Sequence, residues 1–157
     1  MKVIQALPDM PSPVSEEEVS RFLQSRLNMQ LATIDSEGYP NIQPVWFYYE
    51  DGRLYTGTQK GTKKVENLRA NPDKVYFSID DENPPPKGVK GRGEARILEE
   101  DIQRNTAIIE KLNLKYLGTL EHPLAKMLMD NARTGAEVVI EITPKFFSAW
   151  DFGKAGQ

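Results

Sequence analysis

Hydrophobic residues recur along the chain at two spacings, one typical of strands and one typical of helices. Alternation with period two, aromatic and β-branched residues, and nearby turn signals predict six or seven strands. The candidate strands cover residues 29–35, 40–50, 53–58, 74–79, 88–99, 137–142 and 145–152. Apolar residues three and four positions apart predict helices. The candidate helices cover residues 15–28, 61–70, 101–117 and 123–131.

Turn signals between the strands predict how the strands pair. Residues 36–38 and 51–52 join neighbouring strands through connections too short for a parallel crossover. The pairing is therefore expected to be antiparallel. Because closing a sheet removes its exposed edges, short strands of this kind favour a barrel. We predict a mainly β protein with helices, of the α+β class, built on an antiparallel six- or seven-stranded β-barrel with peripheral helices.

Residues 1–14 differ in composition from the rest of the chain. Pro8, Pro11 and Pro13 forbid a regular helix there, so this segment is expected to be an extended N-terminal arm. Ser15 and Glu18 have the spacing of a capping box, which predicts that a helix starts at Ser15. No repeat or linker divides the remainder. Residues 15–157 are therefore interpreted as a single domain.

The composition excludes several classes of function. A net charge of −3, from 20 Lys+Arg and 23 Asp+Glu, argues against a general nucleic-acid binder. The absence of cysteine excludes disulfides and thiolate zinc sites, and His122 as the single histidine excludes a histidine-rich metal site within one chain. No apolar run reaches the ~18 residues of a membrane span, and no signal-peptide pattern opens the chain. The expectation is a soluble, cytoplasmic protein.

A cluster of cations marks the helix predicted after residue 60. Lys60, Lys63 and Lys64 lie at or just before its N-terminus, where the helix dipole already carries positive charge. Such an arrangement favours a bound anion such as a phosphate, which free backbone amides and the Thr62 hydroxyl would also contact. A solvated lysine cluster balanced by Glu66 is the alternative. Gly57 and Gly61 are expected to let the chain turn beside this cluster, and the segment matches neither the Walker loop nor the dinucleotide fingerprint.

Two aromatic segments offer further candidate surfaces. Residues 45–49 are apolar on both faces of their strand, and Pro44 interrupts the hydrogen-bond ladder beside them. A sheet buried on both faces explains this pattern, and so does a planar ligand stacked between subunits. Trp150 lies in the aromatic segment 146–152. An aromatic terminal strand of this kind is typical of a core or a dimer interface, with ligand contact as the alternative.

The order of these features resembles the pyridoxamine 5′-phosphate oxidase-like superfamily of flavin-binding split barrels. The resemblance rests on LATIDSEGYPNIQPVWFYYEDGRLYTGTQKGTKKVENLRANPDKVYFSI at residues 31–79 and on KGRGEARIL at residues 90–98. It implies a split barrel, bound FMN, and a homodimer with the cofactor sites at the subunit interface. It places Gln43, Pro44, Val45 and Trp46 along the isoalloxazine ring, and Tyr55 and Thr56 on the returning strand that also edges the flavin. It places the 5′-phosphate at Thr62, Lys63 and Lys64, and Trp150 near the ring from the partner chain.

The resemblance implies an FMN-dependent oxidoreductase acting on a small molecule of unknown identity. One alternative is a deazaflavin-dependent reductase, for whose longer acidic tail Lys60, Lys87 or Lys90 would matter. Another is a non-catalytic flavin carrier or sensor. The sequence departs from the vitamin enzyme at Gly88, where that oxidase offers a glutamine, and no histidine follows His122. Because this histidine precedes a proline, haem is the least expected cofactor.

Overall fold

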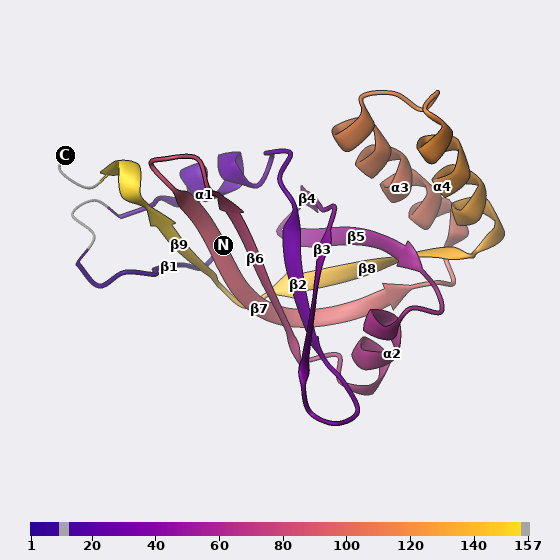
Figure 1. The fold of residues 1–157 in the computed structure, drawn as a ribbon, viewed down its shortest axis with the longest axis horizontal. Helices are drawn as coiled ribbons and strands as arrows, with labels where there is room; N and C mark the ends of the chain where they lie inside the picture. The colour runs from indigo at the N-terminus through magenta and orange to yellow at the C-terminus, as the bar shows by residue number, and fades with distance from the viewer. Residues whose placement is uncertain (10–12, 155–157) are drawn as a thin grey trace.

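A single curled sheet, flanked by four α-helices, organises the part of the chain that the structure describes (Figure 1). The structure is a computed structural model that describes residues 1–9 and 13–154. Residues 10–12 of the predicted arm, Pro11 among them, and residues 155–157 of the predicted domain lie outside it. The helices are α1 (Glu16–Phe22), α2 (Lys63–Ala70), α3 (Ile102–Leu117), α4 (Pro123–Thr134) and the short 3-10 turn η1 (Phe152–Lys154).

The sheet contains nine strands within residues 1–9 and 13–154. They are β1 (Val3–Gln5), β2 (Met29–Ile34), β3 (Pro40–Val45), β4 (Tyr48–Glu50), β5 (Arg53–Gln59), β6 (Val75–Asp81), β7 (Lys87–Leu98), β8 (Glu137–Pro144) and β9 (Phe147–Asp151). Seven follow the order β3-β2-β6-β7-β8-β5-β4, while β9 pairs with β7 and β1 pairs with β9. All described pairs are antiparallel except β1 with β9. The sheet does not close, so the prediction of an antiparallel split barrel in the α+β class is confirmed.

The strand β7 changes partners along its length and so makes the corner of the barrel. Its first residues pair with β9, and residues 93–98 pair with β8. A Cβ on Gly91 would come under 3.0 Å from the backbone of Phe146, between β8 and β9, and a Cβ on Gly93 would come under 3.0 Å from the backbone of Thr143 in β8. Glycine is needed at both positions because two backbones approach each other there, as their place inside a strand predicts.

Two hydrophobic clusters fill the molecule, one on each side of β5 and β8. The cluster inside the barrel includes Phe47, Phe77 and Ile140. The other lies between the outer face of the sheet and the α3–α4 hairpin and includes Tyr55 and Ile109. Neighbouring residues of β8 therefore face different clusters. Both faces of this strand are buried, which explains why its sequence does not alternate between apolar and polar residues. The hairpin covers one end of the sheet, and α1 lies at the other (Figure 1).

Three expectations about element bounds need correction. The first helix ends at Phe22 rather than near residue 28, because its last turn tightens and leads the chain toward β2. The strand expected at residues 40–50 breaks after Val45, since α3 binds the backbone of Phe47. The extended arm contributes β1 to the sheet. The break and the extra strand raise the count above the six or seven predicted.

Candidate functional site

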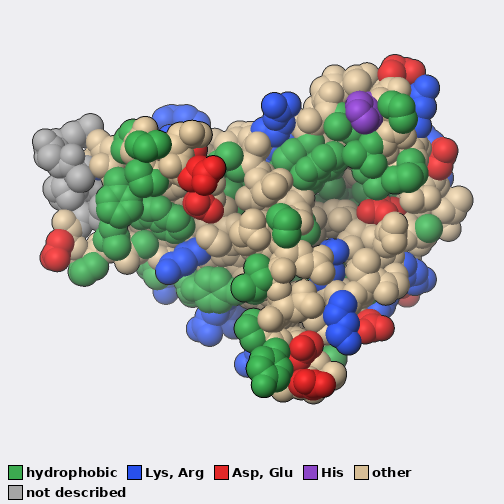
Figure 2. Space-filling view, viewed as in Figure 1, with side chains coloured by type: hydrophobic (Ala, Val, Ile, Leu, Met, Phe, Trp, Pro, Cys, Tyr) green, Lys and Arg blue, Asp and Glu red, His purple; other side chains and the backbone are tan. Residues whose placement is uncertain are grey.

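A cleft of about 360 Å³ opens between the α3–α4 hairpin and the sheet. Figure 2 shows the surface hollowed below the hairpin, with hydrophobic side chains around the hollow. The lining residues are Asn28, Pro44, Val45, Trp46, Gly57, Lys64, Ile109, Leu112, Asn113, Leu128 and Glu137. A volume of this size is in the range of small-molecule sites, and the mixture of apolar walls with a few polar groups is typical of them.

Sheet pairing brings the polar residues of the cleft together. Glu137 begins β8 and lies directly opposite Gln59, the last residue of β5. The helix α2 follows β5 after a short turn, so Lys64 in its first turn lies at the same end of the sheet. Asn113 reaches the cleft from α3, one residue after Leu112 and about one helical turn after Ile109. Residues far apart in sequence thus meet at one cavity.

Lys64 is the cation of the cleft. Its Nζ donates a hydrogen bond to Oε1 of Gln43 over 2.9 Å, which links α2 to β3. Burial lowers the pKa of Lys64, and the nearby Glu137 carboxylate acts in the opposite direction. A partly buried ammonium group held in this way is preorganised to bind an acceptor oxygen of a ligand.

Two buried polar side chains face the cleft without a complete set of partners. Glu137 is 5% exposed, and its Oε2 has no hydrogen-bond partner among the described residues. Burial raises the pKa of Glu137, although Lys64 opposes the shift. Asn113 is 0% exposed, and neither its Oδ1 nor its Nδ2 has a partner in the described part of the chain. Unpaired buried groups are costly, so each points to a ligand or a water in this cavity.

A flat aromatic wall closes one side of the cleft. The ring of Trp46 stacks on that of Tyr116, with centroids 4.7 Å apart and planes 3° from parallel. The Tyr116 hydroxyl is itself fixed by hydrogen bonds to backbone groups of Leu27 and Phe47. The indole is thus held at a set angle, and it offers a planar ligand a rigid surface.

The start of α2 has open backbone amides. Thr62 occupies the N-cap position, but its side chain makes no capping hydrogen bond and donates to the carbonyl of Gln59 over 3.0 Å. The first-turn amides of a helix have no intrahelical acceptor. Lys63 instead lies 3.5 Å from Glu66, and Lys60 lies 3.3 Å from Glu99. Of the three predicted phosphate-binding residues, only Lys64 lines the cleft; Thr62 and Lys63, at the start of α2, do not line it.

The structure separates the residues predicted to flank the ring into two groups. Pro44, Val45 and Trp46 line the cleft, and Gln43 contacts it through Lys64. Tyr55 and Thr56 do not line it. Tyr55 packs under α3 and accepts a hydrogen bond from Arg104, whereas Thr56 is buried and its hydroxyl has no partner among the described residues.

Asn113 and Glu137 were not among the predicted site residues, and the turn expected at Gly57 is wrong. Gly57 lies within β5 in an extended segment and makes no turn. Gly57 and Tyr55 are two positions apart and so lie on the same face of β5. Gly57 lines the cleft because it has no side chain to fill this part of the cavity. A glycine inside a strand is a signal of close approach, and that signal was available. No local pattern marks Asn113, since a polar residue on a helix is more often exposed.

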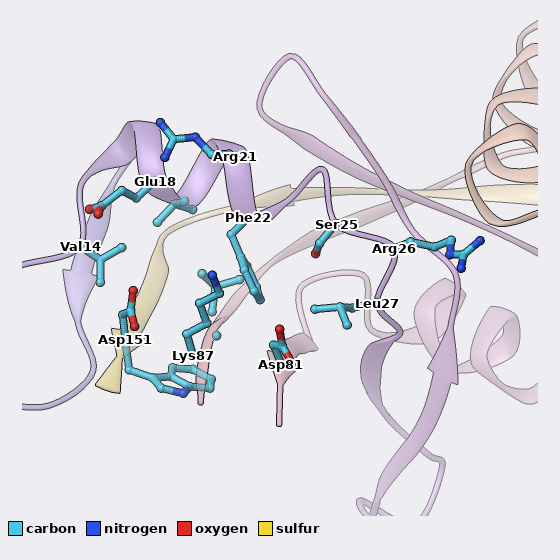
Figure 3. Close-up of a pocket in the computed structure, with 14 residues that line it drawn as sticks. Val14, Glu18, Arg21, Phe22, Ser25, Arg26, Leu27, Asp81, Lys87 and Asp151 are labelled. Carbon is cyan, nitrogen blue, oxygen red and sulfur yellow. The ribbon is translucent and has the colours of Figure 1, made fainter. Parts of the chain in front are cut away.

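Trp150 lies in a second cavity, of about 400 Å³, that shares no lining residue with the cleft. Figure 3 shows Phe22 of α1, Lys87 of β7 and Asp151 of β9 around it. A Cβ on Gly88 would come under 3.0 Å from the indole of Trp150, so glycine at this position lets the ring lie against β7. Within one chain, Trp150 and Lys64 therefore belong to different cavities.

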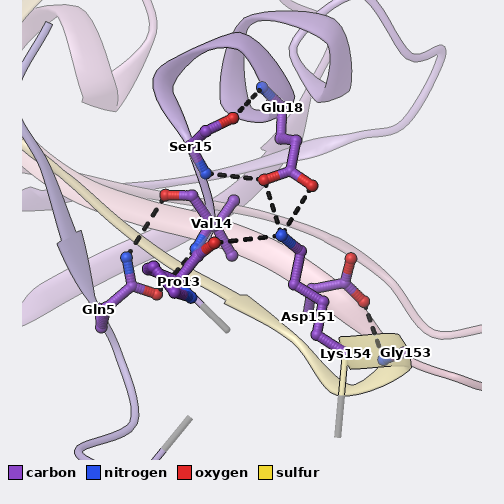
Figure 4. A network of polar contacts seen from close by, with 8 residues as sticks. All are labelled: Gln5, Pro13, Val14, Ser15, Glu18, Asp151, Gly153 and Lys154. Atoms are coloured by element: carbon purple, nitrogen blue, oxygen red, sulfur yellow. Dashed lines mark hydrogen bonds and ion pairs between the residues drawn. The ribbon is translucent and has the colours of Figure 1, made fainter. Parts of the chain in front are cut away.

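Polar contacts beside this second cavity hold the two ends of the chain together (Figure 4). Lys154 donates to Glu18 over 2.7 Å and to the carbonyl of Pro13 over 3.1 Å. Glu18 also accepts the amide of Ser15, which completes the predicted capping box. These hydrogen bonds, with that of Lys154 the strongest influence, lower the pKa of Glu18.

Neither a membrane-spanning helix nor a cluster of metal-ligating side chains is found in residues 1–9 and 13–154. No helix there combines the length and hydrophobicity needed to span a bilayer. No group of three or more His, Cys, Asp or Glu side chains comes together there as a metal site. His122 caps α4 by accepting the amide of Leu124 at its Nδ1 over 3.0 Å.

Comparison with known proteins identifies the family. The family model of pyridoxamine 5′-phosphate oxidase matches residues 15–151, and the chain belongs to this family. A conserved hypothetical protein of Mycobacterium tuberculosis, Rv2991, is similar in structure with a TM-score of 0.80 and 26% identity, over 98% of this chain and 94% of that one. An F420 reductase gives a TM-score of 0.63 and 28% identity, over 82% of this chain and 94% of that one.

A third relative carries a different ligand in its name. Heme oxygenase HutZ of Vibrio cholerae serotype O1 is 31% identical over 67 residues, which are 43% of this chain. The match spans 38% of that relative's length. The F420 reductase and HutZ are thus named for different ligands.

Proposed function

We propose that this chain binds FMN in the cleft between the α3–α4 hairpin and the sheet and acts as an oxidoreductase on a small molecule. The observation that carries the proposal is the position of Lys64. It lies beside the open amides of α2 and also lines a cavity that has a rigid aromatic wall. A phosphate tail and a flat ring need these two features next to each other.

The donor set of the cleft fits a flavin nucleotide. Lys64 and the first-turn amides of α2 suit a phosphate, and the stacked Trp46 suits a planar ring. Ile109, Leu112 and Leu128 supply the apolar part of the lining, which suits the ring. When bound, a flavin supplies hydride or electron transfer, and the protein contributes binding, orientation and electrostatics.

A homodimer is part of the proposal. Ile42 and Tyr76 both pair with Ala32, so they share the outer face of β3, β2 and β6. They are 63% and 41% exposed, respectively, which leaves an apolar stripe that a second copy could cover. The family resemblance assigns Trp150 to the partner's ring, and its place in a separate cavity agrees with that assignment. We propose that each complete site combines the cleft of one protomer with Trp150 of its partner.

A deazaflavin is the second candidate cofactor. The likeness to an F420 reductase, at 28% identity, favours it specifically. The longer acidic tail of that coenzyme needs more cations than FMN does. Lys60 and Lys63 lie near the start of α2 in exposed ion pairs that a stronger acidic partner could replace.

The visible spectrum of the purified protein, followed by ligand titration, tests the cofactor. Bands of oxidised flavin, or saturable FMN binding by the apoprotein, would support the proposal; deazaflavin bands would favour the second candidate, and haem bands would contradict both. We expect Lys64→Ala to weaken FMN binding by about tenfold or more, because a charge-assisted hydrogen bond is lost. The matched control is Lys60→Ala, since Lys60 pairs with Glu99 outside the cleft.

Two further measurements test the rest of the proposal. Turnover with a nicotinamide donor and a small electron acceptor would separate an enzyme from a flavin carrier. Trp150→Ala is expected to alter the fluorescence of bound flavin. An unchanged fluorescence spectrum in a dimer would contradict the position proposed for Trp150.

A further inference from the structure

The inner wall of the cleft carries unsatisfied hydrogen-bonding capacity of both kinds. Asn113 offers one amide donor group and one acceptor oxygen, both buried and both without partners among the described residues. Glu137 adds a buried oxygen, Oε2, that is also unpaired in the described part of the chain. Both side chains line the same cavity. Leaving such groups dry and unpaired costs free energy, so the cavity is built for a polar occupant.

These groups define the occupant's chemistry. Asn113 Oδ1 needs a donor, and Asn113 Nδ2 needs an acceptor. Oε2 of an ionised Glu137 needs a second donor, and Lys64 can give a hydrogen bond to a second acceptor. A phosphate or carboxylate supplies acceptors alone, so it gives no donor to Asn113 Oδ1. A hydrocarbon supplies neither kind of group.

We propose that Asn113 binds a ring edge that carries an N–H group flanked by carbonyl oxygens, as in a cyclic imide. Its Oδ1 accepts the N–H and its Nδ2 donates to one of the carbonyls, which leaves Glu137 Oε2 for a second donor of the same ligand. This inference rests on the proposed function, because the pyrimidine half of a flavin has such an edge and a deazaflavin has the same one. The rim of a haem carries carboxylates and no N–H donor. Asn113 thus selects flavins over haem, and it fixes which edge of the ring enters the cleft.

The test compares two ligands that differ only in the substituent on one ring nitrogen. FMN carries the ring N–H, and 3-methyl-FMN carries a methyl group there; the phosphate is the same in both, so its contribution cancels. The apoprotein is titrated with each ligand, and binding is followed by flavin fluorescence. We expect the wild-type protein to bind FMN about tenfold more tightly, the usual effect of leaving one buried acceptor unpaired.

A substitution on the protein separates hydrogen bonding from steric fit. In Asn113→Leu the amide is replaced by an apolar group of similar size, and the preference for FMN is expected to disappear as FMN binding weakens. The matched control is Asn105→Leu. Asn105 lies on the same helix and is 1% exposed, but it does not line the cleft. This control is expected to keep the preference.

The outcomes are distinct. The first comparison uses the wild-type protein alone. If it binds FMN and 3-methyl-FMN equally, the imide assignment is overturned and the proposed function still stands. A preference that persists in Asn113→Leu would indicate steric exclusion of the methyl group and would also overturn the assignment. Failure of FMN to bind at all would contradict the proposed function itself.

Discussion

The hydroxyl of Tyr116 accepts a hydrogen bond from the backbone amide of Phe47 over 3.1 Å. It also donates to the carbonyl of Leu27 over 2.6 Å. Phe47 is the residue at which the long aromatic strand breaks into β3 and β4. One phenol of α3 thus satisfies two backbone groups that the sheet leaves unpaired, and it fixes the aromatic wall of the cleft.

Removal of this hydroxyl is expected to destabilise the protein. Tyr116→Phe keeps the ring stack on Trp46 but leaves the Phe47 amide and the Leu27 carbonyl without the hydroxyl. Unpaired buried groups cost about 1–3 kcal/mol, so we expect the free energy of unfolding to fall by that amount. Urea denaturation measures it, with Tyr39→Phe as control, because Tyr39 is 66% exposed. Equal unfolding curves for the wild type and Tyr116→Phe would show that water replaces the hydroxyl.

Lys115 is expected to make stability depend on pH above neutrality. Its Nζ donates to the carbonyl of Phe47 over 2.8 Å, and burial lowers its pKa from 10.5 to about 8. The unfolded state therefore binds more protons between these two pH values, so the free energy of unfolding should rise as the pH rises through that window. Thermal unfolding from pH 7 to pH 10 measures the rise.

The Lys115→Met variant isolates this contribution. It removes the titrating amine but keeps an unbranched side chain against the ring of Phe47, which lies 3.7 Å from Nζ in the wild type. The rise in melting temperature above pH 8 should be smaller in this variant. Lys111→Met serves as the control, because Glu50 raises the pKa of Lys111. A rise of the same size in Lys115→Met would mean that other groups cause it.

Local signals in the sequence were sufficient for most of the fold. Hairpin turns gave the antiparallel pairing, and the capping box at Ser15 gave the start of α1. The break at Phe47 could not be predicted, because it depends on Tyr116 and Lys115, about seventy positions away in the chain. The same limitation applies to β1, whose pairing with β9 is a contact between the two ends of the chain.

The candidate site was predicted less completely than the fold. Lys64 and Trp46 were accessible to charge and pattern arguments, since an unfavourable helix charge and a two-faced aromatic strand are visible locally. Asn113 and Glu137 could not be predicted in this way, because what marks them is that their buried polar atoms have no hydrogen-bond partner among the described residues. Unsatisfied hydrogen bonding is a property of a folded neighbourhood. Only the packing of α3 on β5 and β8 reveals it.

Gly91, at the corner that β7 makes, is expected to be needed for full stability. A Cβ on Gly91 would come under 3.0 Å from the carbonyl of Phe146 and from the ring of Phe77. We expect Gly91→Ala to lower the free energy of unfolding by about 2 kcal/mol or more, since the backbone must shift. Gly61→Ala is the matched control, because a Cβ there meets nothing within 4 Å. Equal stability of the two variants by urea denaturation would show that the corner adjusts without strain.

Gly57 is expected to limit ligand binding without limiting stability. A Cβ at this position would lie 3.6 Å from Ile109, 3.6 Å from Glu137 and 3.7 Å from Leu112, which are ordinary contacts. Gly57→Ala should therefore fold as well as the wild type, and the loss of glycine's freedom in the unfolded chain acts in its favour. The added methyl group nevertheless enters the cleft, and we expect FMN affinity to fall by about tenfold or more as the ring is displaced.

Tyr55→Phe, two residues earlier on the same face but outside the cleft, should leave affinity unchanged. Full FMN affinity in Gly57→Ala would mean that the ring binds elsewhere.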